Sequence, residues 1–456
     1  MRRRIPPVAT LIAASLALGA GLVACGDDGG STSSKQSSDQ AKVGGDVRLW
    51  IMPNGPKPKE DMDALVKPFE QKTGVNVDVE VVGWDVQFDR IRNAAISGEG
   101  PDLTQAGTTQ VPFFAALGGF ENIAERTSDV GGKAAYPGGV WQTTQVVGRD
   151  GTWALPWFTE ARAIYYRKDV LKKAGVDEAT AFTDWDAFRA TLEQVKQVKE
   201  INGKPIQPFG SPGKKAFDLV HHVMPFVWDA GGAELSDDNK KSAIASPEAE
   251  QGVKFMADLL SDGLYDKSQL ERDGTGVENQ FKGGRLAVWM GGPWVLGSVK
   301  RADDENWVPA ARKNVGIAPM PSGPIGEGFT FVGGSNLMML KSSKNKDAAW
   351  ELMKYLSQDQ IQSDYATKQG MFPSRLEPQK LAGEADANYG GFFKAIQQGR
   401  TYAPIPQWGP IENAYKGRFA NILEQAGGGQ LSDGDIQKEL QGAEKEANAL
   451  LAQGTG

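Results

Sequence analysis

The chain has 456 residues, a formal net charge of −7 and a single cysteine. The acidic balance and the lack of a basic cluster argue against nucleic acid as a partner. One cysteine excludes an intramolecular disulfide, and with only two histidines a catalytic thiol has few candidate partners.

The first 24 residues have the three parts of a secretory signal peptide. Three arginines precede an apolar run over residues 8–23, and a small residue leads to Cys25. The run is too short to span a membrane comfortably, so retention as a membrane helix is the weaker alternative. The tetrapeptide LVAC resembles the lipobox of bacterial lipoproteins, which implies cleavage before Cys25 and its lipidation. Two or more acyl chains would anchor the protein stably on the outer face of the cytoplasmic membrane.

Residues 26–43 have almost no apolar side chains and predict a flexible tether. We expect ordered structure to begin near Gly44, which leaves about 410 residues, enough for two domains. Loss of the three signal-peptide arginines takes the formal charge from −7 to −10.

The folded part begins with a predicted strand, helix and strand, at residues 45–52, 59–74 and 75–84. Such a unit favours a parallel α/β sheet with a right-handed crossover. A helix at 84–100 with Asp85 as its N-cap, a short strand at 101–107 and a helix at 111–120 follow.

The middle of the chain continues the alternation. Two β-rich pieces and a helix are expected in 151–175, and a helix capped near Asp184 in 183–198. Another helix is expected in 221–235, and Ser246 with Pro247 is a strong helix start.

The last part reads helix, strand, glycine turn and helix over 276–300, with strands at 314–321 and 336–343. One long amphipathic helix is expected over 345–370, and the tail from Glu412 is helical. Strands that alternate with helices throughout so long a chain predict two α/β lobes with a site in the crevice between them.

Tryptophan is the compositional outlier, with twelve residues, many of them beside glycine or proline. We expect about half of them, including Trp185 and Trp350, to lie in cores. Aromatic side chains in glycine- and proline-rich loops point instead to binding.

Five segments in this order resemble the extracellular solute-binding proteins of family 1, the sugar-binding components of ABC importers: LPWFTEARAIYYRKD, PEAEQGVKFMADLLSDG, FKGGRLAVWMGGPW, VGIAPMPSG and KDAAWELMKYLSQDQIQSDYATKQGMFPSR. The resemblance covers essentially the whole chain after the tether. It implies two α/β lobes joined by crossing strands, with the sugar enclosed in the cleft by hinge closure. The first lobe would hold residues 44–159 and 315–356, and the second 160–314 and 357–456.

The resemblance also implies site residues. Trp294, in the GPW segment, stands where the family stacks an indole on a sugar ring, and Gly292 would let the backbone approach the ligand. Trp157, Phe158 and Glu160 would lie where the chain crosses between the lobes. A carboxylate accepts charge-assisted hydrogen bonds from two sugar hydroxyls. A salt bridge from Glu160 to Arg162 is the alternative, as core packing is for Trp294.

Loops after the strands of the first lobe supply further candidates for hydroxyl recognition: Asn54, Trp84, Asp85, Thr108, Thr109 and Gln110. Capping explains Asp85 equally well, and turn chemistry explains Asn54 equally well. Loop-like contexts in the second lobe add Trp228, Asp229 and Trp408, with core packing as the alternative for Trp408. Gly333, Gly334 and Asn336 are expected on a loop that faces the cleft, whereas Met371 is expected in the core.

Little in the sequence supports catalysis or metal binding. His221 and His222 are adjacent, so on a helix they point in different directions, and we interpret both as structural. We expect no enzyme activity, metal or cofactor. The partners expected are a carbohydrate, the permease subunits of an importer and the membrane through a lipid anchor, with the protein itself a monomer. A lipid-anchored glycoside hydrolase and a polysaccharide-binding surface protein remain the alternatives.

Overall fold

The computed structural model describes residues 44–301, 304–385, 387–432 and 434–453. The signal peptide, Cys25 and the tether lie outside the described residues, as does the predicted lipidation. The described residues all belong to one compact unit, and the first strand begins at Gly45, beside the expected start of order.

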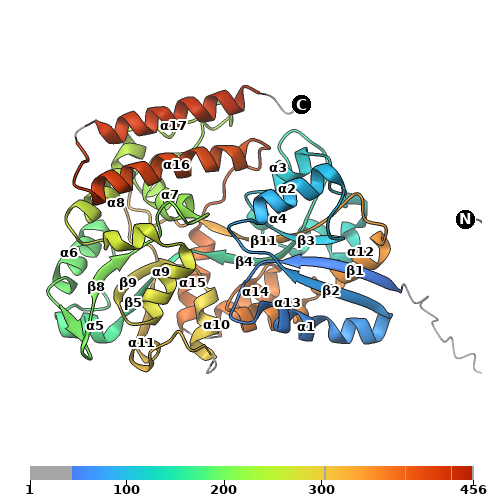
Figure 1. The fold of residues 1–456 in the computed structure, drawn as a ribbon, viewed down its shortest axis with the longest axis horizontal. Helices are drawn as coiled ribbons and strands as arrows, with labels where there is room; N and C mark the ends of the chain where they lie inside the picture. Colours follow the sequence, from blue (N-terminus) through green and yellow to red (C-terminus); the bar gives the residue numbers. More distant parts are fainter. Residues whose placement is uncertain (1–43, 302–303, 386, 433, 454–456) are drawn as a thin grey trace, which may run out of the picture. The chain divides into compact units, whose positions relative to one another are not determined.

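A six-stranded sheet organises the first part of the chain (Figure 1). Its order is β12 (Phe372–Pro373), β4 (Leu155–Ala161), β11 (Val332–Met339), β3 (Leu103–Gly107), β1 (Gly45–Ile51) and β2 (Val75–Val81). β1 pairs in parallel with β2 and β3, whereas β11 is antiparallel to β3 and β4. The expected parallel unit is therefore confirmed, within a sheet that is mixed.

Helices and turns follow the strands of this sheet. They are α1 (Pro58–Thr73), α2 (Gln87–Ser97), α3 (Val111–Ala116), η1 (Ala124–Val130), η2 (Gly132–Ala135), α4 (Gly138–Gln142), α12 (Lys346–Leu356) and α13 (Asp359–Gln369). α1 ends at Gly74, whose φ of 77° is a left-handed conformation that suits glycine. We call the six-stranded sheet with these helices the first lobe.

A four-stranded sheet organises the rest, in the order β10 (Val315–Ala318), β5 (Ala163–Arg167), β9 (Leu286–Gly291) and β8 (Gln207–Gly210). Its helices are α5 (Lys168–Ala174), α6 (Trp185–Val195), α7 (Leu219–Asp229), α8 (Pro247–Ser261), η3 (Lys267–Glu271), α9 (Gly274–Lys282), α10 (Trp294–Lys300) and α11 (Pro309–Lys313), with α16 (Trp408–Gly427) and α17 (Asp435–Leu451) from the tail. A small hairpin, β6 (Glu200–Ile201) and β7 (Lys204–Pro205), lies outside the sheet. We call this sheet with its helices the second lobe.

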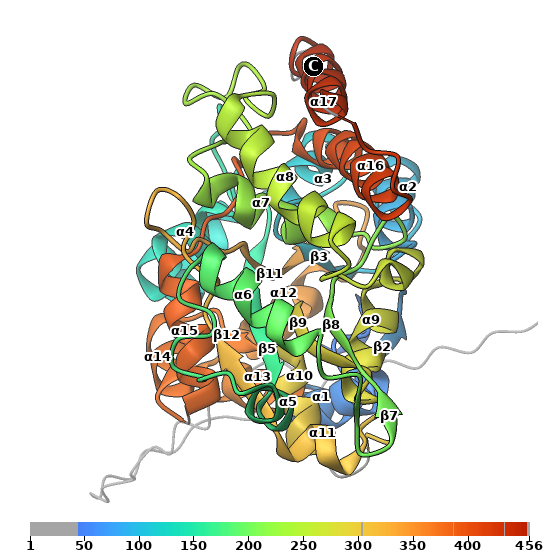
Figure 2. The ribbon, with the colours of Figure 1, turned by 90° about the vertical axis from the view of Figure 1, so that its left-hand side faces the viewer.

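α16 packs against α7, α8 and α17, as Figure 2 shows, and also contacts α3 of the first lobe. The remaining helices, α14 (Leu376–Gly383) and α15 (Ala387–Gln398), follow β12, and α15 contacts strands of both sheets. A single residue, Arg162, separates β4 of the first sheet from β5 of the second. The chain therefore passes between the lobes at this residue.

Local capping signals are confirmed. The Asp184 side chain accepts a hydrogen bond from the Ala187 amide at 2.8 Å, and that of Ser246 accepts one from the Ala249 amide at 3.1 Å, with Pro247 as the first helical residue. Trp185 and Trp350 are buried on helices, as expected.

Four expectations about elements are wrong. The helix expected over 345–370 is two helices, because Gln358 is extended (φ −65°, ψ 143°). α2 has Val86 and not Asp85 as its N-cap. β10 belongs to the second lobe because it pairs with β5, and β12 belongs to the first because it pairs with β4, so both lobe boundaries move.

Candidate functional site

Arg162 lies at the centre of a buried polar network where the chain crosses between the lobes. Its side chain is 2% exposed, and its guanidinium forms ion pairs with Glu160 and, at 2.8 Å, with Asp218. Thr330 donates a hydrogen bond to the Arg162 carbonyl at 2.8 Å. The salt bridge that was the alternative for Glu160 is therefore present.

Asp218 links this arginine to the two histidines. The residue directly precedes α7, and its Oδ2 lies 3.3 Å from His222 Nε2. On its other side, His222 Nδ1 lies 3.2 Å from the Ser211 hydroxyl. Burial alone would raise the pKa of Asp218, but His222 and Arg162 outweigh that effect and lower it.

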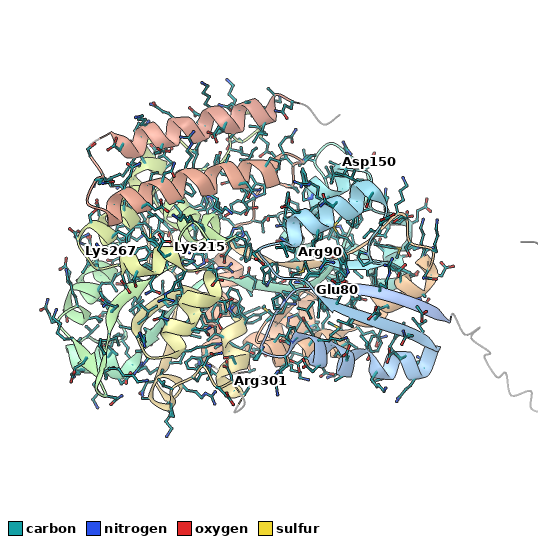
Figure 3. All side chains as sticks on the ribbon, viewed as in Figure 1. Glu80, Arg90, Asp150, Lys215, Lys267 and Arg301 are labelled. Atoms are coloured by element: carbon teal, nitrogen blue, oxygen red, sulfur yellow. The ribbon has the colours of Figure 1, made fainter. Side chains whose placement is uncertain are left out.

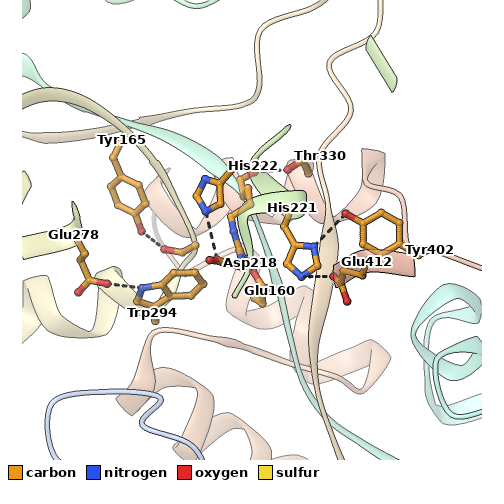
Figure 4. A network of polar contacts seen from close by, with 12 residues as sticks. Glu160, Tyr165, Asp218, His221, His222, Glu278, Trp294, Thr330, Tyr402 and Glu412 are labelled. Atoms are coloured by element: carbon orange, nitrogen blue, oxygen red, sulfur yellow. Dashed lines mark hydrogen bonds and ion pairs between the residues drawn. The ribbon is translucent and has the colours of Figure 1, made fainter. Parts of the chain in front are cut away.

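His221 leads from the same helix to α16. Its Nδ1 lies 3.1 Å from the Tyr402 hydroxyl, and its Nε2 lies 3.4 Å from Glu412 Oε1. Thr109, in the first lobe, donates a hydrogen bond to Glu412 Oε2 at 3.2 Å. The two histidines thus point in different directions, as expected, but both belong to one network that joins the lobes (Figure 4).

Burial controls the protonation of this network. It raises the pKa of Glu160 to about 7, although the charge of Arg162 opposes the shift. It raises the pKa of Glu412 to about 8, with the Thr109 hydrogen bond in opposition. It also lowers the pKa of His221 well below its usual value, so this imidazole is neutral at pH 7. Near neutral pH, the two glutamates therefore change charge easily when their surroundings change.

Trp294 is the first residue of α10 and lies beside the same network. It is half-buried, its indole nitrogen donates a hydrogen bond to Glu278 at 2.7 Å, and the Arg162 guanidinium lies 4.9 Å from the ring centroid. A Cβ added to Gly292 would lie 1.8 Å from this indole. Gly292 is therefore needed to make room for the ring of Trp294 itself.

A small pocket lies between the lobes at the end of the network formed by Thr109 and Tyr402. Its walls are Thr108, Thr109, Pro112, Gln142 and Thr143 from the first lobe and residues 401–404 from the second. The space inside is about that of one water molecule, so a sugar does not fit there in this conformation.

Several buried polar atoms around the crossing have no hydrogen-bond partner among the described residues. They are Gln110 Oε1, Trp157 Nε1, Thr159 Oγ1, Arg162 Nε, Asp218 Oδ1, Asn336 Oδ1 and Trp408 Nε1. Each such atom costs free energy unless it is satisfied in some state of the protein. Atoms of this kind also occur elsewhere in the described residues, but those of Arg162 and Asp218 belong to the network that joins the lobes, which makes this network the candidate site.

The predicted aromatic residues are more deeply buried than side chains that contact a ligand from a surface loop. Trp157 is 1% exposed and stacks on Tyr365 at 4.5 Å, and Phe158 is 3% exposed. Trp228 is 1% exposed on α7, and Trp408 is 0% exposed at the start of α16, stacked on Tyr402 at 4.2 Å. The loop contexts expected for Trp228 and Trp408 are therefore wrong, because both residues begin or complete a helix.

The predicted polar residues are held by protein partners. The Asn54 amide donates hydrogen bonds to Gln105 at 2.9 Å and to Tyr365 at 2.8 Å, and the Asn336 amide donates one to the Thr143 hydroxyl at 3.0 Å. The Phe329 amide donates a hydrogen bond to Asp229 at 2.6 Å.

Gly333, Gly334 and Asn336 lie in β11, so the loop expected there is wrong. Met371 is buried, as expected. Asp85 is exposed, and Trp84 before it is half-buried and contacts Phe217 of the second lobe.

No helix of the described residues is long and apolar enough to cross a membrane. Within the same residues, histidine, cysteine and carboxylate side chains nowhere gather in a group of three or more that could hold a metal ion.

Comparison with known proteins identifies the family. Residues 55–363 match the family described as bacterial extracellular solute-binding protein. This chain belongs to that family. A putative binding protein of Brucella abortus is 26% identical over 411 residues, which cover 89% of this chain and 93% of the relative. The diacetylchitobiose-binding protein DasA of Streptomyces coelicolor is 28% identical over 405 residues, with 86% and 87% covered.

The fold of this solute-binding protein also matches solved structures of the same kind. An ABC transporter solute-binding protein of Thermotoga lettingae, bound with α-D-tagatose, aligns with a TM-score of 0.77 and 25% identity over 89% of this chain and 99% of the other. The two-lobe α/β fold predicted from the sequence is therefore confirmed.

Sequence reasoning missed several residues of the solute-binding protein's candidate site. Asp218, Tyr402 and Glu412 complete the Arg162 network, and Phe217 faces Trp84, yet none was predicted to bind. Phe217 and Asp218 adjoin the histidine pair, and Glu412 follows Trp408 by one helical turn. Neither Asp218 nor Glu412 carries a local signal, because only the fold brings each of them to its partners.

Proposed function

We propose that this protein is the extracellular substrate-binding component of an ABC importer and that it captures a di- or oligosaccharide between its two lobes. One observation carries the proposal: where the chain crosses between the lobes, buried polar atoms of Arg162 and Asp218 lack hydrogen-bond partners, and the Trp294 ring lies 4.9 Å from the Arg162 guanidinium. A sugar supplies what such a place needs, because its hydroxyls donate and accept hydrogen bonds and its ring faces are apolar.

Glu160 and Glu412 are two buried carboxyl groups at the junction that can form hydrogen bonds with sugar hydroxyls. Glu160 is buried within β4, and Glu412 is buried on α16 next to Thr109 of the first lobe. The pKa of each glutamate is raised because burial disfavours the carboxylate. Sugar hydroxyls that donate to these groups would favour their charged forms. The ligand would thereby release part of the cost of burying them.

Closure of the lobes would couple capture to transport. Contacts between the lobes, such as that from Thr109 to Glu412, are lost when the lobes separate. A ligand that contacts both lobes only in the closed state shifts the equilibrium towards closure. We propose that the permease subunits recognise this closed state and receive the sugar from it.

The remaining assignments concern the place of the protein in the cell. The LVAC segment supports a lipid anchor on Cys25, and the polar residues 26–43 support a tether between the anchor and the binding domain. We propose that the protein acts as a monomer on the outer face of the cytoplasmic membrane and does not alter its ligand chemically.

A panel of disaccharides tests the proposal. Thermal unfolding is followed with maltose, trehalose, cellobiose, xylobiose and diacetylchitobiose, with mannitol at equal concentration as the control for osmolyte effects. A ligand at 100 times its Kd stabilises the folded state by about 2.7 kcal/mol, a shift of several degrees. The sugar is then recovered for mass spectrometry. Fragments would indicate a hydrolase, and no shift with any sugar would rule out this substrate class.

A further inference from the structure

The indole of Trp294 is held by a polar network inside the second lobe. Its nitrogen donates a hydrogen bond to Glu278 Oε2 at 2.7 Å, and Glu278 lies on α9 (Figure 4). The other oxygen of this carboxylate forms an ion pair with Lys282 at 2.5 Å, one turn further along the same helix. Glu278 therefore connects the ring at the junction of the lobes to a lysine of α9.

Lys282 continues the network from α9 to α10. Its side chain is only 6% exposed, and it also pairs with Asp304 at 3.0 Å. Asp304 Oδ2 accepts a hydrogen bond from the hydroxyl of Ser298, which lies on α10, at 2.6 Å. Burial opposes the charge of Lys282, but its two carboxylate partners outweigh burial and raise the pKa of the lysine. We call Glu278, Lys282, Ser298 and Asp304 the α10 network.

The α10 network also encloses Arg301, which directly follows α10. The Arg301 amide donates a hydrogen bond to the Ser298 carbonyl at 3.2 Å, and the Asp304 amide donates one to the Arg301 carbonyl at 3.4 Å. The backbone is therefore held on both sides of Arg301. The guanidinium of this arginine donates a hydrogen bond to Asp61 of the first lobe at 2.7 Å. One network thus supports both ends of α10, where the proposed sugar contact and a contact between the lobes lie.

α10 is a short helix in close contact with the first lobe. A Cβ added to Gly297, in the middle of α10, would lie 2.6 Å from the backbone nitrogen of Gly370, which follows α13. A helix of seven residues is about 10 Å long and is displaced as one piece. Displacement of α10 would therefore move Trp294 and Arg301 together.

We propose that the α10 network positions α10 so that the sugar contact of Trp294 and the ion pair of Arg301 with Asp61 form together. This inference rests on the proposed sugar-binding function and extends it to the coupling of capture with closure. The members of the network are positioning residues, which act through α10 and not by contact with the sugar. Their charges are buried, so an arrangement of α10 that separates them is costly.

The network could instead serve only to hold the second lobe together. Its loss would then lower stability, but the ion pair of Arg301 would still favour closure by the same factor. If the network places Arg301, its loss already removes the contribution of this ion pair, and Arg301→Gln has little left to remove. A double-mutant cycle in affinity separates the two roles.

The cycle combines Arg301→Gln with Lys282→Met and, separately, with Glu278→Gln. Lys282→Met removes both ion pairs. Glu278→Gln removes one charge but keeps an oxygen that can accept the indole hydrogen bond, so it tests the network even if Lys282→Met does not fold. Lys254→Met is the matched control, because Lys254 forms an exposed ion pair with Asp258 one turn away on α8. Calorimetry uses the disaccharide of the panel above that stabilises the wild type most, and the Tm without sugar identifies the folded variants.

We expect Arg301→Gln to weaken binding roughly fivefold in the wild-type and Lys254→Met backgrounds, but less than about twofold in the Lys282→Met and Glu278→Gln backgrounds. Each network variant should itself weaken binding by about fivefold or more, because it loses the same contribution to closure. An equal effect of Arg301→Gln in all backgrounds, or no effect in the wild type, would overturn the positioning role while leaving sugar binding intact. Failure of the wild type to bind any disaccharide of the panel would overturn the proposed function as well.

Discussion

The guanidinium of Arg162 donates a hydrogen bond to the carboxylate of Asp218 at 2.8 Å, and both side chains are almost completely buried. This pair fixes the first turn of α7 to the residue at which the chain passes between the lobes. A buried ion pair is costly to break, because the partner that remains is an uncompensated charge.

Removal of Asp218 should therefore destabilise the fold. We expect Asp218→Ala to cost about 3–5 kcal/mol, measured by urea unfolding at pH 7. Asp262→Ala is the control, because Asp262 pairs with Arg189 on the surface, where the loss should be below about 1 kcal/mol. Similar small costs for both variants would mean that the buried network adds nothing to stability.

Trp294 should matter for affinity more than for stability. Its ring is half-buried at the junction and packs against two hydrophobic clusters, and Trp294→Ala removes this flat apolar surface while the buried Val295 and Leu296 of α10 remain. We expect affinity for the best disaccharide to fall by roughly 2 kcal/mol, with a Tm in the absence of ligand within a few degrees of wild type. Unchanged affinity in calorimetry would remove Trp294 from the site.

Gly292 gives an independent test of the same ring. A methyl group at this position would overlap the indole, so Gly292→Ala should displace the ring of Trp294 and thereby weaken sugar binding. Gly138→Ala is the control, because a Cβ there has open space around it. Wild-type affinity in Gly292→Ala would show that the ring position is not important.

The boundaries of the elements could be predicted where a local signal exists. Gly74 ends α1, and Ser246 with Pro247 begins α8, because caps act within one turn of the chain. The break at Gln358 carries no proline or glycine, so periodicity alone read α12 and α13 as one helix. The sheet to which β10 or β12 belongs depends on strand pairing over long sequence distances, so it could not be predicted from local sequence signals.

The sequence indicated the residue types of the candidate site better than it indicated how deeply these residues are buried. Tryptophan in a proline-rich segment suggested a loop for Trp408, but stacking on Tyr402 buries it at the start of α16. Glu412 could not be chosen among the many carboxylates, because only the fold brings it to Thr109 and His221. Positions of this kind are decided by tertiary contacts.

Glu412 should make stability depend on pH. Its pKa is raised from 4.5 to about 8 because burial disfavours the carboxylate, and it faces Thr109, His221, Asp218 and Lys416. The folded state therefore holds a proton that the unfolded state loses above its own pKa. The stability from this group is fully present below about pH 4.5 and is lost as pH rises towards 8.

Glu412→Gln should abolish this part of the pH dependence. We expect the Tm of the variant minus that of wild type to increase from pH 5 to pH 8.5, because only the wild type has a buried carboxyl group that loses its proton over this range. Thr109→Val is the control, since it removes the hydrogen bond between the lobes but keeps the carboxyl group. A Tm difference that is constant with pH would contradict the raised pKa.

Asp61 of α1 supplies a second contact between the lobes. Its carboxylate accepts hydrogen bonds from Arg301 of the second lobe at 2.7 Å and from Gln369 at 2.9 Å, and it pairs with Lys368 at 2.9 Å. Burial opposes the charge of Asp61, but these three partners outweigh it and lower its pKa. Lys368 and Gln369 belong to α13 of the first lobe. Only Arg301, which follows α10, comes from the second lobe (Figure 3).

Arg301→Gln should therefore weaken sugar binding without altering a sugar contact. Loss of about 1 kcal/mol from the closed state alone lowers affinity roughly fivefold for every ligand length, because a closing contact acts on all ligands alike. Arg90→Gln is the control: Arg90 pairs with Glu80 at 2.7 Å within the first lobe, on the surface, and should leave affinity unchanged. Calorimetry with one disaccharide and one trisaccharide measures both variants. Equal affinity of Arg301→Gln and wild type would mean that the pair persists or is replaced when the lobes open.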